Sequence, residues 1–264
     1  MKLSIVIVNY NSKKYLRECL FSIEKNIPKK FLLSEVEVVI VNNDKDALVL
    51  EKNFSLKIHI INLKENNGFG RANNVGVKKA SGEFLFFLNP DTIIKDYNFF
   101  EIINFLEKNP STGIIGPKII LKKENRPQPW TSGKKTTFWN IVFRNNFNKP
   151  WNKNKNVEVD WVSGTAFLTR KKDFEKIGGF DEKFFMYFED QDLCLRIKKN
   201  GKKIIFYPDH KIIHLDGKSW SDEKRKKTFF YQSQDYFFKK HNPPWQGFLL
   251  KKIRVFFLYF QRFF

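Results

Sequence analysis

The sequence predicts an α/β protein with a mixed, mostly parallel and doubly wound sheet flanked by helices. Apolar, β-branched stretches alternate with helix-like segments from residue 3 to residue 91, the pattern of repeated β–α units. The apolar stretches are continuous, as in strands buried on both faces. Polar residues follow each of them, and ligands of such sheets bind in the crevice beyond the carboxyl ends of the strands.

The first part of the chain is the most regular. Strands are predicted at 3–8, 36–41, 57–62 and 84–88, and helices at 12–27 and 72–80. Ser12 is a suitable N-cap for the first helix. Amides, carboxylates and glycine follow the strands, namely Asn9, Asn43 with Asp44, Asn67 with Gly68, and Asn89 with Asp91. Such residues make good turns, but four such loops at one sheet edge favour a binding site.

The second part is less regular. Residues 122–160 are rich in Lys, Asn, Pro and Trp, which predicts an irregular excursion that is either mobile or covers the site. Further strands are predicted at 161–169, 204–207 and 211–214, and helices at 171–177 and 189–199, each ended by glycine. We therefore divide the chain into residues 1–95, a second half of the same domain at 96–220, and a C-terminal segment at 221–264.

Composition limits the classes of partner. The chain has 264 residues, 42% of them apolar, which suffices for a buried core, and its formal charge of +20 implies an anionic partner. Nucleic acid, a phosphorylated ligand and acidic lipid all qualify. Cys19 and Cys194 lack metal-binding spacing and do not suggest a disulfide framework. The first apolar run breaks at Asn9, too early for a signal peptide, so we expect a cytoplasmic protein.

The C-terminal stretch, residues 245–264, mixes Phe, Leu and Tyr with Lys and Arg. Its longest apolar run, residues 255–260, is far shorter than the ~20 residues of a spanning helix. An interfacial helix on anionic lipid fits this composition. A helix packed on the domain and a truncated longer segment are the open alternatives.

Two groups of polar residues could carry chemistry. Glu189, Asp190 and Asp192 open a predicted helix, where the dipole favours each negative charge by about 0.3–1 kcal/mol. Aromatic residues stand immediately before them, which also suits a sugar-binding wall with a general base, so both interpretations stay open. Asp91 can hold Mg²⁺ or Mn²⁺ through oxygen, and His214 is a candidate ligand. Residues 216–219 could form a loop over phosphates.

Six motifs in order give the chain a resemblance to a known family. They are SIVIVNYNS at 4–12, NNGFGRAN at 66–73, FLNPDT at 87–92, VSGTA at 162–166, IGGFDEKFF at 177–185 and EDQDLCLR at 189–196. With them the chain resembles a family 2 glycosyltransferase of the Rossmann-like GT-A fold, in the bacterial rhamnosyltransferase-like branch. The resemblance extends from Ser4 to about His241.

The resemblance implies an activity and a cofactor. It implies inverting transfer of a single sugar, with rhamnose expected, from a dTDP- or UDP-linked donor in surface polysaccharide synthesis. The acceptor would be a hydroxyl of a glycan or of a polyprenyl-diphosphate-linked molecule. Asp91 matches the surviving carboxylate of the family's Asp-x-Asp motif, whose first position here is Asn89. His214 matches a residue that helps to hold the divalent metal, Mn²⁺ or Mg²⁺.

The resemblance also assigns roles around the acids. Asp190 matches the general base and Glu189 would orient acceptor hydroxyls; an Asp of ordinary pKa, near ~3.9, is already ionised at neutral pH. The expected donor-binding residues are Asn9, Asn43, Asp44, Asn67, Gly68, Arg71, Asn73 and Asn89. The expected acceptor-binding residues are Trp161, Gly164, Thr165 and Tyr187. Whether Asn43, Asp44 or Asp46 contacts the nucleotide base stays open.

The three segments take roles accordingly. Residues 1–95 would bind the nucleotide sugar, and residues 96–220 would bind the acceptor and carry catalysis. Residues 221–264 would lie on the anionic surface at the inner face of the cell membrane.

Two other functions compete. A sugar nucleotidyltransferase needs a glycine-rich phosphate loop with Lys or Arg near the first strand, and residues 9–17 contain no glycine. A basic nucleic-acid-binding protein would explain the charge of +20 and the Lys- and Trp-rich residues 122–155. It would leave the acids at 189–192 without a role, and no RNA- or DNA-binding motif is present, so we expect no nucleic-acid partner.

Overall fold

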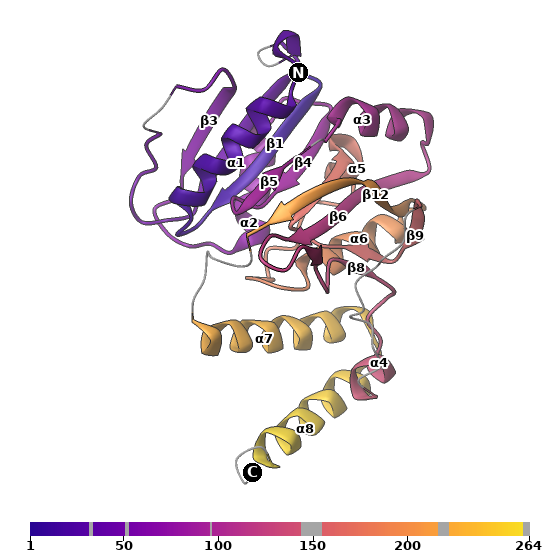
Figure 1. Ribbon diagram of the computed structural model, residues 1–264. Helices are drawn as coiled ribbons and strands as arrows, with labels where there is room; N and C mark the ends of the chain where they lie inside the picture. Colours follow the sequence, from indigo (N-terminus) through magenta and orange to yellow (C-terminus); the bar gives the residue numbers. More distant parts are fainter. Residues whose placement is uncertain (32–33, 51–52, 96, 144–154, 216–221, 261–264) are drawn as a thin grey trace.

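The computed structural model describes residues 1–31, 34–50, 53–95, 97–143, 155–215 and 222–260. A mixed sheet flanked by helices forms the body of the molecule, and two C-terminal helices, α7 (Glu223–His241) and α8 (Pro244–Phe260), lie together on one side of it (Figure 1). Within the described residues no helix is long and apolar enough to cross a membrane. The expected phosphate loop at 216–219 lies outside the described residues.

Four parallel strands form one half of the sheet, as predicted. Their order is β3-β2-β1-β4, with β1 (Leu3–Asn9), β2 (Val36–Asn42), β3 (Lys57–Asn62) and β4 (Phe84–Leu88). Alternate side chains of β1, β2 and β4 enter two separate apolar cores, because successive residues of a strand point to opposite faces. Helices α1 (Lys13–Asn26) and α3 (Phe99–Lys108) cover one face; α2 (Phe69–Lys79), α5 (Lys171–Lys176) and α6 (Glu189–Lys199) cover the other.

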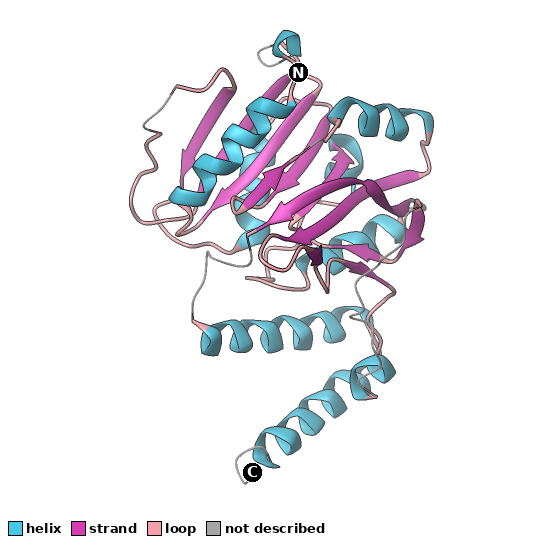
Figure 2. Ribbon diagram, in the orientation of Figure 1, coloured by secondary structure: helices cyan, strands magenta, loops and turns pink. Residues whose placement is uncertain are grey.

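The other half of the sheet is mixed (Figure 2). Strand β11 (Ala166–Arg170) runs antiparallel between β4 and β6 (Thr112–Leu121), and β12 (Lys203–His214) is parallel to β6. Strand β5 (Thr92–Ile94) pairs antiparallel with β12, with Thr92 opposite His214. That register brings His214 beside Asp91. Short strands complete the structure: β7 (Arg126–Pro127), β8 (Ser132–Gly133), β9 (Val157–Val159) and β10 (Trp161–Val162).

Some predicted boundaries are wrong. The single strand expected at 161–169 is two strands in different sheets, because a turn at 163–165 separates β10, which pairs with β8, from β11. The two strands expected at 204–207 and 211–214 are one strand, β12, with an irregular register between Tyr207 and Lys211. Helix α2 begins at Phe69 rather than Ala72. Ser12 precedes α1, but its hydroxyl donates to the Tyr10 carbonyl instead of capping the helix.

The described part of the irregular excursion covers the site. Besides β7, β8 and β9 it forms one short helix, α4 (Phe138–Val142). Gln128, Trp130 and Ile141 line a cavity that also holds the acids of α6. Of the two interpretations left open by the sequence, a covering segment is the one that these residues support. Residues 144–154 lie outside the described residues.

A third apolar core lies between the acids and the C-terminal helices. Its buried members come from α4, from the segment that leads into α6, from α7 and from α8: Phe138, Phe184, Phe188, Phe237, Phe238 and Leu250. Phe238 is fully buried. Helices α7 and α8 are therefore packed onto the domain by a core of their own.

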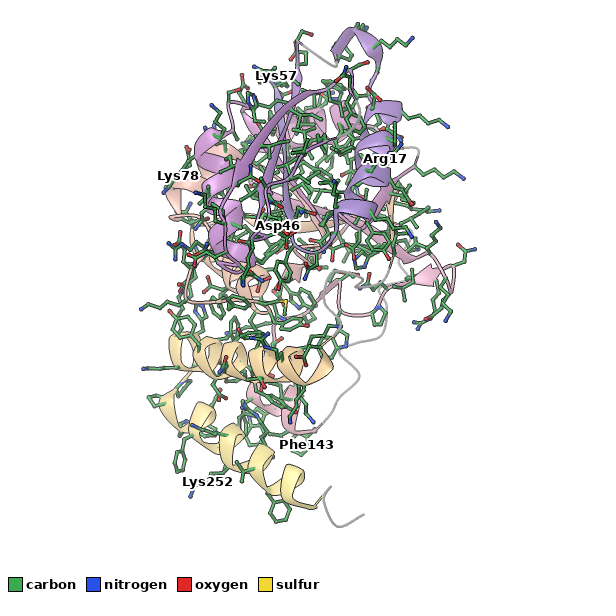
Figure 3. The ribbon with its side chains drawn as sticks, turned by 90° about the vertical axis from the view of Figure 1, so that its left-hand side faces the viewer. Arg17, Asp46, Lys57, Lys78, Phe143 and Lys252 are labelled. Carbon is green, nitrogen blue, oxygen red and sulfur yellow. The ribbon has the colours of Figure 1, made fainter. Side chains whose placement is uncertain are left out.

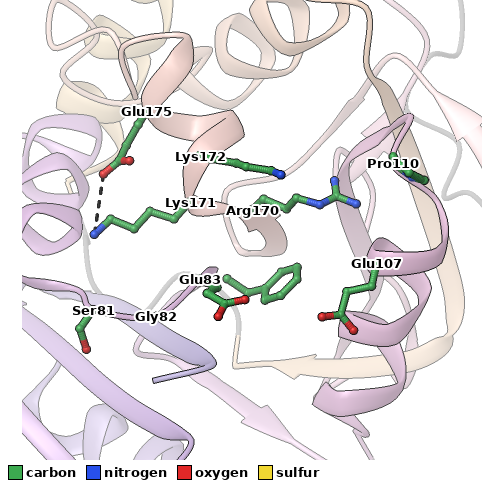
Figure 4. A pocket seen from close by; sticks show the side chains of 10 residues that line it. Ser81, Gly82, Glu83, Glu107, Pro110, Arg170, Lys171, Lys172 and Glu175 are labelled. Carbon is green, nitrogen blue, oxygen red and sulfur yellow. Dashed lines mark ion pairs between the residues drawn. The ribbon is translucent and has the colours of Figure 1, made fainter.

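A cavity of about 630 Å³ opens at the opposite edge of the sheet, near the start of β4 and the end of β11 (Figure 4). Its buried cation, Arg170, donates from Nη1 to the Thr112 carbonyl at 2.7 Å and pairs with Asp173 at 3.2 Å. Nη2 bonds the Leu106 carbonyl in the last turn of α3. The guanidinium thus satisfies carbonyls around a helix end and is engaged in holding the fold.

Candidate active site

Three cavities follow one another along the edge where β1, β2 and β4 end. The first, of about 580 Å³, lies beside residues 9–14 and 42–48. The middle one, of about 150 Å³, shares Tyr10, Asn43 and Asn66 with the first. The third, of about 740 Å³, shares Phe69, Asn89 and Met186 with the middle one. Shared walls make the three a single cleft along the edge that the sequence marked.

A row of amides forms the floor of the first cavity. Asn9 donates from Nδ2 to Asn42 Oδ1 at 2.8 Å, and Asn42 donates to Asn62 Oδ1 at 2.9 Å, because parallel pairing sets the three residues side by side. Asp44 accepts from Asn9 Nδ2 at 3.1 Å and from the Asn11 backbone N–H at 3.0 Å. Burial raises the pKa of the Asp44 carboxyl, although these hydrogen bonds oppose the shift.

Asn43 binds the loop between β3 and α2 instead of joining this row of amides. Its amide donates to Asn66 Oδ1 at 2.9 Å, and its Oδ1 accepts the Asn67 N–H at 3.0 Å, so the whole group ties the β3–α2 loop to the sheet edge. Asn43, Asp44 and Asp46 all line the first cavity, where the carboxylate of Asp44 is half-buried and the side chain of Asp46 is exposed. All three candidates for contact with the base therefore reach this cavity.

Gly68 lines the middle cavity, at the point where the segment before α6 approaches the start of α2. Its φ of +83° is in the left-handed region, and a Cβ there would lie 2.6 Å from the Phe185 carbonyl oxygen. The next residue, Phe69, donates its N–H to that same oxygen at 2.9 Å. Only glycine allows this approach, which brings the segment before α6 against the start of α2.

Three expected donor residues lie outside the cleft. Asn67 lines none of the three cavities, and its Nδ2 donates to the Glu65 carbonyl at 3.3 Å. The other two are on α2. Arg71 is exposed and its guanidinium is 3.7 Å from Glu182, on the first turn of α2. Asn73 is buried and donates back to the Phe69 carbonyl at 3.0 Å within the same helix. Neither residue lines any of the three cavities, so the structure does not bring them together with the other candidates.

The acids at the start of α6 face the third cavity. Tyr187 and Phe188, directly before them, both have left-handed backbone angles, φ of 71° and 64°. For residues with a side chain this costs of order 1–2 kcal/mol each, which marks a functional segment. Asp190 Oδ2 accepts the Gly164 N–H at 3.0 Å and Oδ1 accepts the Gln191 N–H at 2.7 Å. Two backbone donors thus fix the carboxylate.

Burial changes the acidity of both carboxyls. It raises the pKa of Asp190, against the lowering effect of the hydrogen bond from Gly164, so the expectation of an ordinary pKa is wrong. Burial, followed by the negative charge of Asp190, raises the pKa of Glu189 well above its usual range. Glu189 Oε2 is buried without a hydrogen-bond partner among the described residues. A ligand hydroxyl would satisfy that atom.

The expected acceptor residues all line the third cavity. Trp161 is held by a hydrogen bond from Nε1 to the Lys134 carbonyl at 3.1 Å, and Thr165 accepts the Asn89 N–H on its carbonyl at 2.9 Å. Gly164 and Tyr187 complete the set. Further lining residues that the sequence does not predict lie on the excursion and on α7, namely Gln128, Trp130, Ile141, Phe230 and Gln234. No motif marks them, because α7 reaches the cavity only through tertiary packing.

Asp91 and His214 form a pair beneath the cleft. Asp91 Oδ1 lies 3.2 Å from His214 Nε2, and His214 Nδ1 lies 2.7 Å from Gln128 Oε1. A proton on Nδ1 that is donated to Gln128 leaves the Nε2 lone pair facing the carboxylate, an arrangement that a cation between them would satisfy. Oxygen and imidazole nitrogen suit Mn²⁺. Within the described residues no third His, Cys, Asp or Glu joins them, so phosphate or water would supply the other ligands.

Helix α7 anchors the helix that carries the acids. Asp192, fully buried, lies 2.7 Å from His241 Nε2 and 2.7 Å from Lys240 Nζ, and Arg196 approaches it at 2.7 Å. Burial alone would raise the pKa of Asp192, but the hydrogen bond from His241 and the charge of Arg196 outweigh it and lower the pKa to about 2. The first turn of α6 is thus held through Asp192 by His241 and Lys240 of α7, and Arg196 of α6 itself contacts the same carboxylate.

Comparison with known proteins decides among the three classes of function. The family model described as "Glycosyl transferase family 2" matches residues 4–178, well over half of the chain. The chain belongs to glycosyl transferase family 2. A second model, "N-terminal domain of galactosyltransferase", matches residues 151–218. The expected family is confirmed, and glycosyl transfer prevails over nucleotidyl transfer and nucleic-acid binding.

Two individual relatives of this glycosyltransferase are rhamnosyltransferases, the branch of the family that the sequence predicts. The chain is 27% identical over 228 residues to the rhamnosyltransferase WbbL of Escherichia coli K12, covering 80% of this chain and 82% of that protein. It is 32% identical over 91 residues to the N-acetylglucosaminyl-diphospho-decaprenol L-rhamnosyltransferase of Mycobacterium tuberculosis, covering 34% of this chain and 30% of that protein. The crystal structure of GalNAc-T7 with UDP, GalNAc and Mn²⁺ matches with a TM-score of 0.65 at 17% identity, over 90% of this chain and 50% of that one. The last match confirms the GT-A fold.

The raised pKa of Glu189 makes a testable prediction for this glycosyltransferase. In the unfolded chain a Glu ionises near pH ~4.3, while the folded protein keeps Glu189 protonated to higher pH. At this residue the folded state therefore binds more protons, and the contribution of Glu189 to stability falls as the pH rises above ~4.3. Glu189→Gln cannot ionise, so its melting temperature relative to wild type should increase between pH 5 and pH 9, measured by thermal unfolding. A constant difference across that range would contradict a raised pKa.

Proposed function

We propose that the protein is an inverting glycosyltransferase that moves one sugar, with rhamnose expected, from a dTDP- or UDP-linked donor to an acceptor hydroxyl. The observation that carries the proposal is the continuous cleft from Asp44 to Asp190, with the Asp190 carboxylate oriented by two backbone donors. A glycan or a polyprenyl-diphosphate-linked molecule would be the acceptor, in surface polysaccharide synthesis. The relatives named above support this substrate class.

The donor fits the first two cavities. The amide row and Asp44 offer hydrogen-bond partners to a base and ribose in the first cavity. The narrow middle cavity, beside Gly68, Asn89 and Pro90, would take the diphosphate. The loop that contains Asn89 continues into Asp91, which pairs with His214. This order would place the anomeric carbon where the middle cavity meets the third.

The acceptor fits the third cavity, where the two acids divide the work. Asp190 would remove the proton from the acceptor hydroxyl as its oxygen attacks the anomeric carbon. Glu189, whose buried carboxyl has a pKa well above its usual range, would hydrogen-bond a neighbouring hydroxyl and hold the acceptor in place. Attack from the acceptor cavity, opposite the diphosphate, gives a single displacement and therefore inversion. When bound by Asp91 and His214, Mn²⁺ or Mg²⁺ would neutralise charge that develops on the departing diphosphate.

Thermal unfolding with a panel of nucleotides tests the proposal. We expect dTDP or UDP with Mn²⁺ at about 100 times the dissociation constant to add about 2.7 kcal/mol, a shift of about 5–10 °C for a domain of this size. Asp91→Ala should lose the metal-dependent part of that shift, whereas Asp209→Ala, which removes an exposed carboxylate of β12, should keep it. No shift with any nucleotide would refute the donor site, and an unchanged metal effect in Asp91→Ala would refute the metal role.

A further inference from the structure

The outer side of the C-terminal helices is unusually apolar. Most exposed large apolar side chains of the described residues lie on α4 and α8, whereas Val49 and Trp130 lie elsewhere. Five of those on α4 and α8 are more than half exposed, and we call them the α4/α8 patch: Trp139, Phe143, Phe248, Val255 and Phe256. Exposed apolar side chains gathered on two neighbouring helices mark an interaction site more often than they mark chance exposure.

Helix α8 is firmly placed, so the exposure is not that of a loose end. Its inner side contributes Leu250 and Ile253 to the third apolar core. Arg254 donates from Nη1 to Asp235 Oδ2 of α7 at 3.1 Å, and the ring of Trp245 lies 5.3 Å from that of Phe138 of α4. Helix α8 has apolar residues on both its inner and its outer side, but only the inner side packs on the domain. The outer side therefore requires a partner to cover it.

The charges next to the patch indicate what covers it. Lys251 and Lys252 are exposed, and the Lys252 ammonium lies 4.8 Å from the centre of the Phe248 ring. Phe143 and Lys252 lie at the same end of the molecule (Figure 3). Helix α8 contains no Asp or Glu. Aromatic side chains mixed with lysines are typical of helices that lie in the interface of an anionic membrane.

A second copy of the chain fits this surface poorly. In a symmetric dimer the same patch meets itself, which would bring the lysines of two α8 helices together without an acidic residue of α8 to offset them. The whole chain carries a formal charge of +20, which adds to the repulsion. Anionic lipid supplies the opposite charge and attracts lysines that lie near its surface.

We propose that the α4/α8 patch, with Lys251 and Lys252, docks the protein on an anionic lipid surface and turns the third cavity towards it. Ile141 of α4 and Phe230 and Gln234 of α7 line that cavity, so the helices that carry or support the patch also bound the acceptor site. An acceptor carried by a lipid would reach Asp190 from this side. The inference deepens the proposed function, on which its acceptor part rests; the docking itself does not depend on any nucleotide.

The test is sedimentation of the full chain with vesicles of phosphatidylcholine, with and without phosphatidylglycerol. Wild type should sediment with the mixed vesicles and much less with pure phosphatidylcholine. Phe248→Ser with Val255→Ser, and separately Lys251→Gln with Lys252→Gln, should each lower the partition coefficient about tenfold or more. Matched controls, Val49→Ser and Lys78→Gln with Lys79→Gln, remove an equally exposed valine and two exposed lysines of α2 and should bind like wild type.

Each contrary outcome has a distinct meaning. Equal binding of patch and control variants would overturn the proposal, as would wild-type binding that ignores phosphatidylglycerol. A dimer that Phe248→Ser with Val255→Ser abolishes, in a protein that does not bind vesicles, would assign the patch to a second copy. The thermal shift with dTDP or UDP, measured on the same variants, separates this result from a failure of the proposed function, because the patch lies outside the donor cavities.

Discussion

Asp190→Asn is expected to lower the rate of sugar transfer by a factor of about 10²–10⁴, the contribution of a general base, while nucleotide binding remains. Asparagine is nearly the same size and keeps one carbonyl oxygen, which can accept the N–H of Gly164 or of Gln191. The amide cannot take a proton from the acceptor hydroxyl. Radiolabelled sugar transfer measures the rate, and thermal unfolding with dTDP or UDP measures donor binding.

The pH dependence adds a second check on Asp190. Because burial raises its pKa, the wild-type rate should fall on the acid side at a higher pH than an ordinary Asp would give. Asp209→Asn, a change at an exposed carboxylate of β12, should leave both the rate and the profile unchanged. Loss of nucleotide binding in Asp190→Asn would place the residue in the donor site, and an unchanged rate would exclude it as the base.

The donor side of the cleft could be predicted because parallel strands impose it. Asn9, Asn42 and Asn62 end three neighbouring parallel strands, and parallel pairing sets their amides side by side in one hydrogen-bonded row. The apolar runs alone therefore place these side chains at one edge. Asn43 and Asp44 have similar sequence contexts and both line the first cavity, and only the structure shows that Asn43 also braces a loop.

The acceptor side depends on contacts that have no local signal. The expected strand at 161–169 breaks because Gly164 turns its N–H to Asp190, a residue far along the chain. Phe230 and Gln234 enter the cavity because α7 packs on the core around Phe238. Arg71 lies within a glycosyltransferase motif, yet its guanidinium faces Glu182. The place of a residue in a motif thus predicts which part of the fold it belongs to. The direction of its side chain follows from tertiary packing.

Asp192→Asn is expected to destabilise the protein by about 3–5 kcal/mol, because it breaks the ion pairs that the fully buried carboxylate makes with partly buried Arg196 and Lys240. The pH dependence has a definite sign. The folded pKa of about 2 lies below the unfolded value near ~3.9, so the stabilisation is present above ~3.9 and is lost as the pH falls towards 2. Urea unfolding should therefore show a constant gap between wild type and variant from pH 5 to 8 that narrows below pH 4.

Asp235→Asn is the matched control, since Asp235 also pairs with an arginine but is one-third exposed on α7. Exposed pairs contribute about 0–1 kcal/mol, so its unfolding free energy should stay close to that of wild type. Equal stability of the two variants would show that Asp192 does not anchor α6. Because Asp192 lies two residues after Asp190 on the same helix, Asp192→Asn should also slow transfer at temperatures where it remains folded. Slower transfer by the folded variant would show that the Asp192 carboxylate positions Asp190. An unchanged rate would show that it only stabilises the fold.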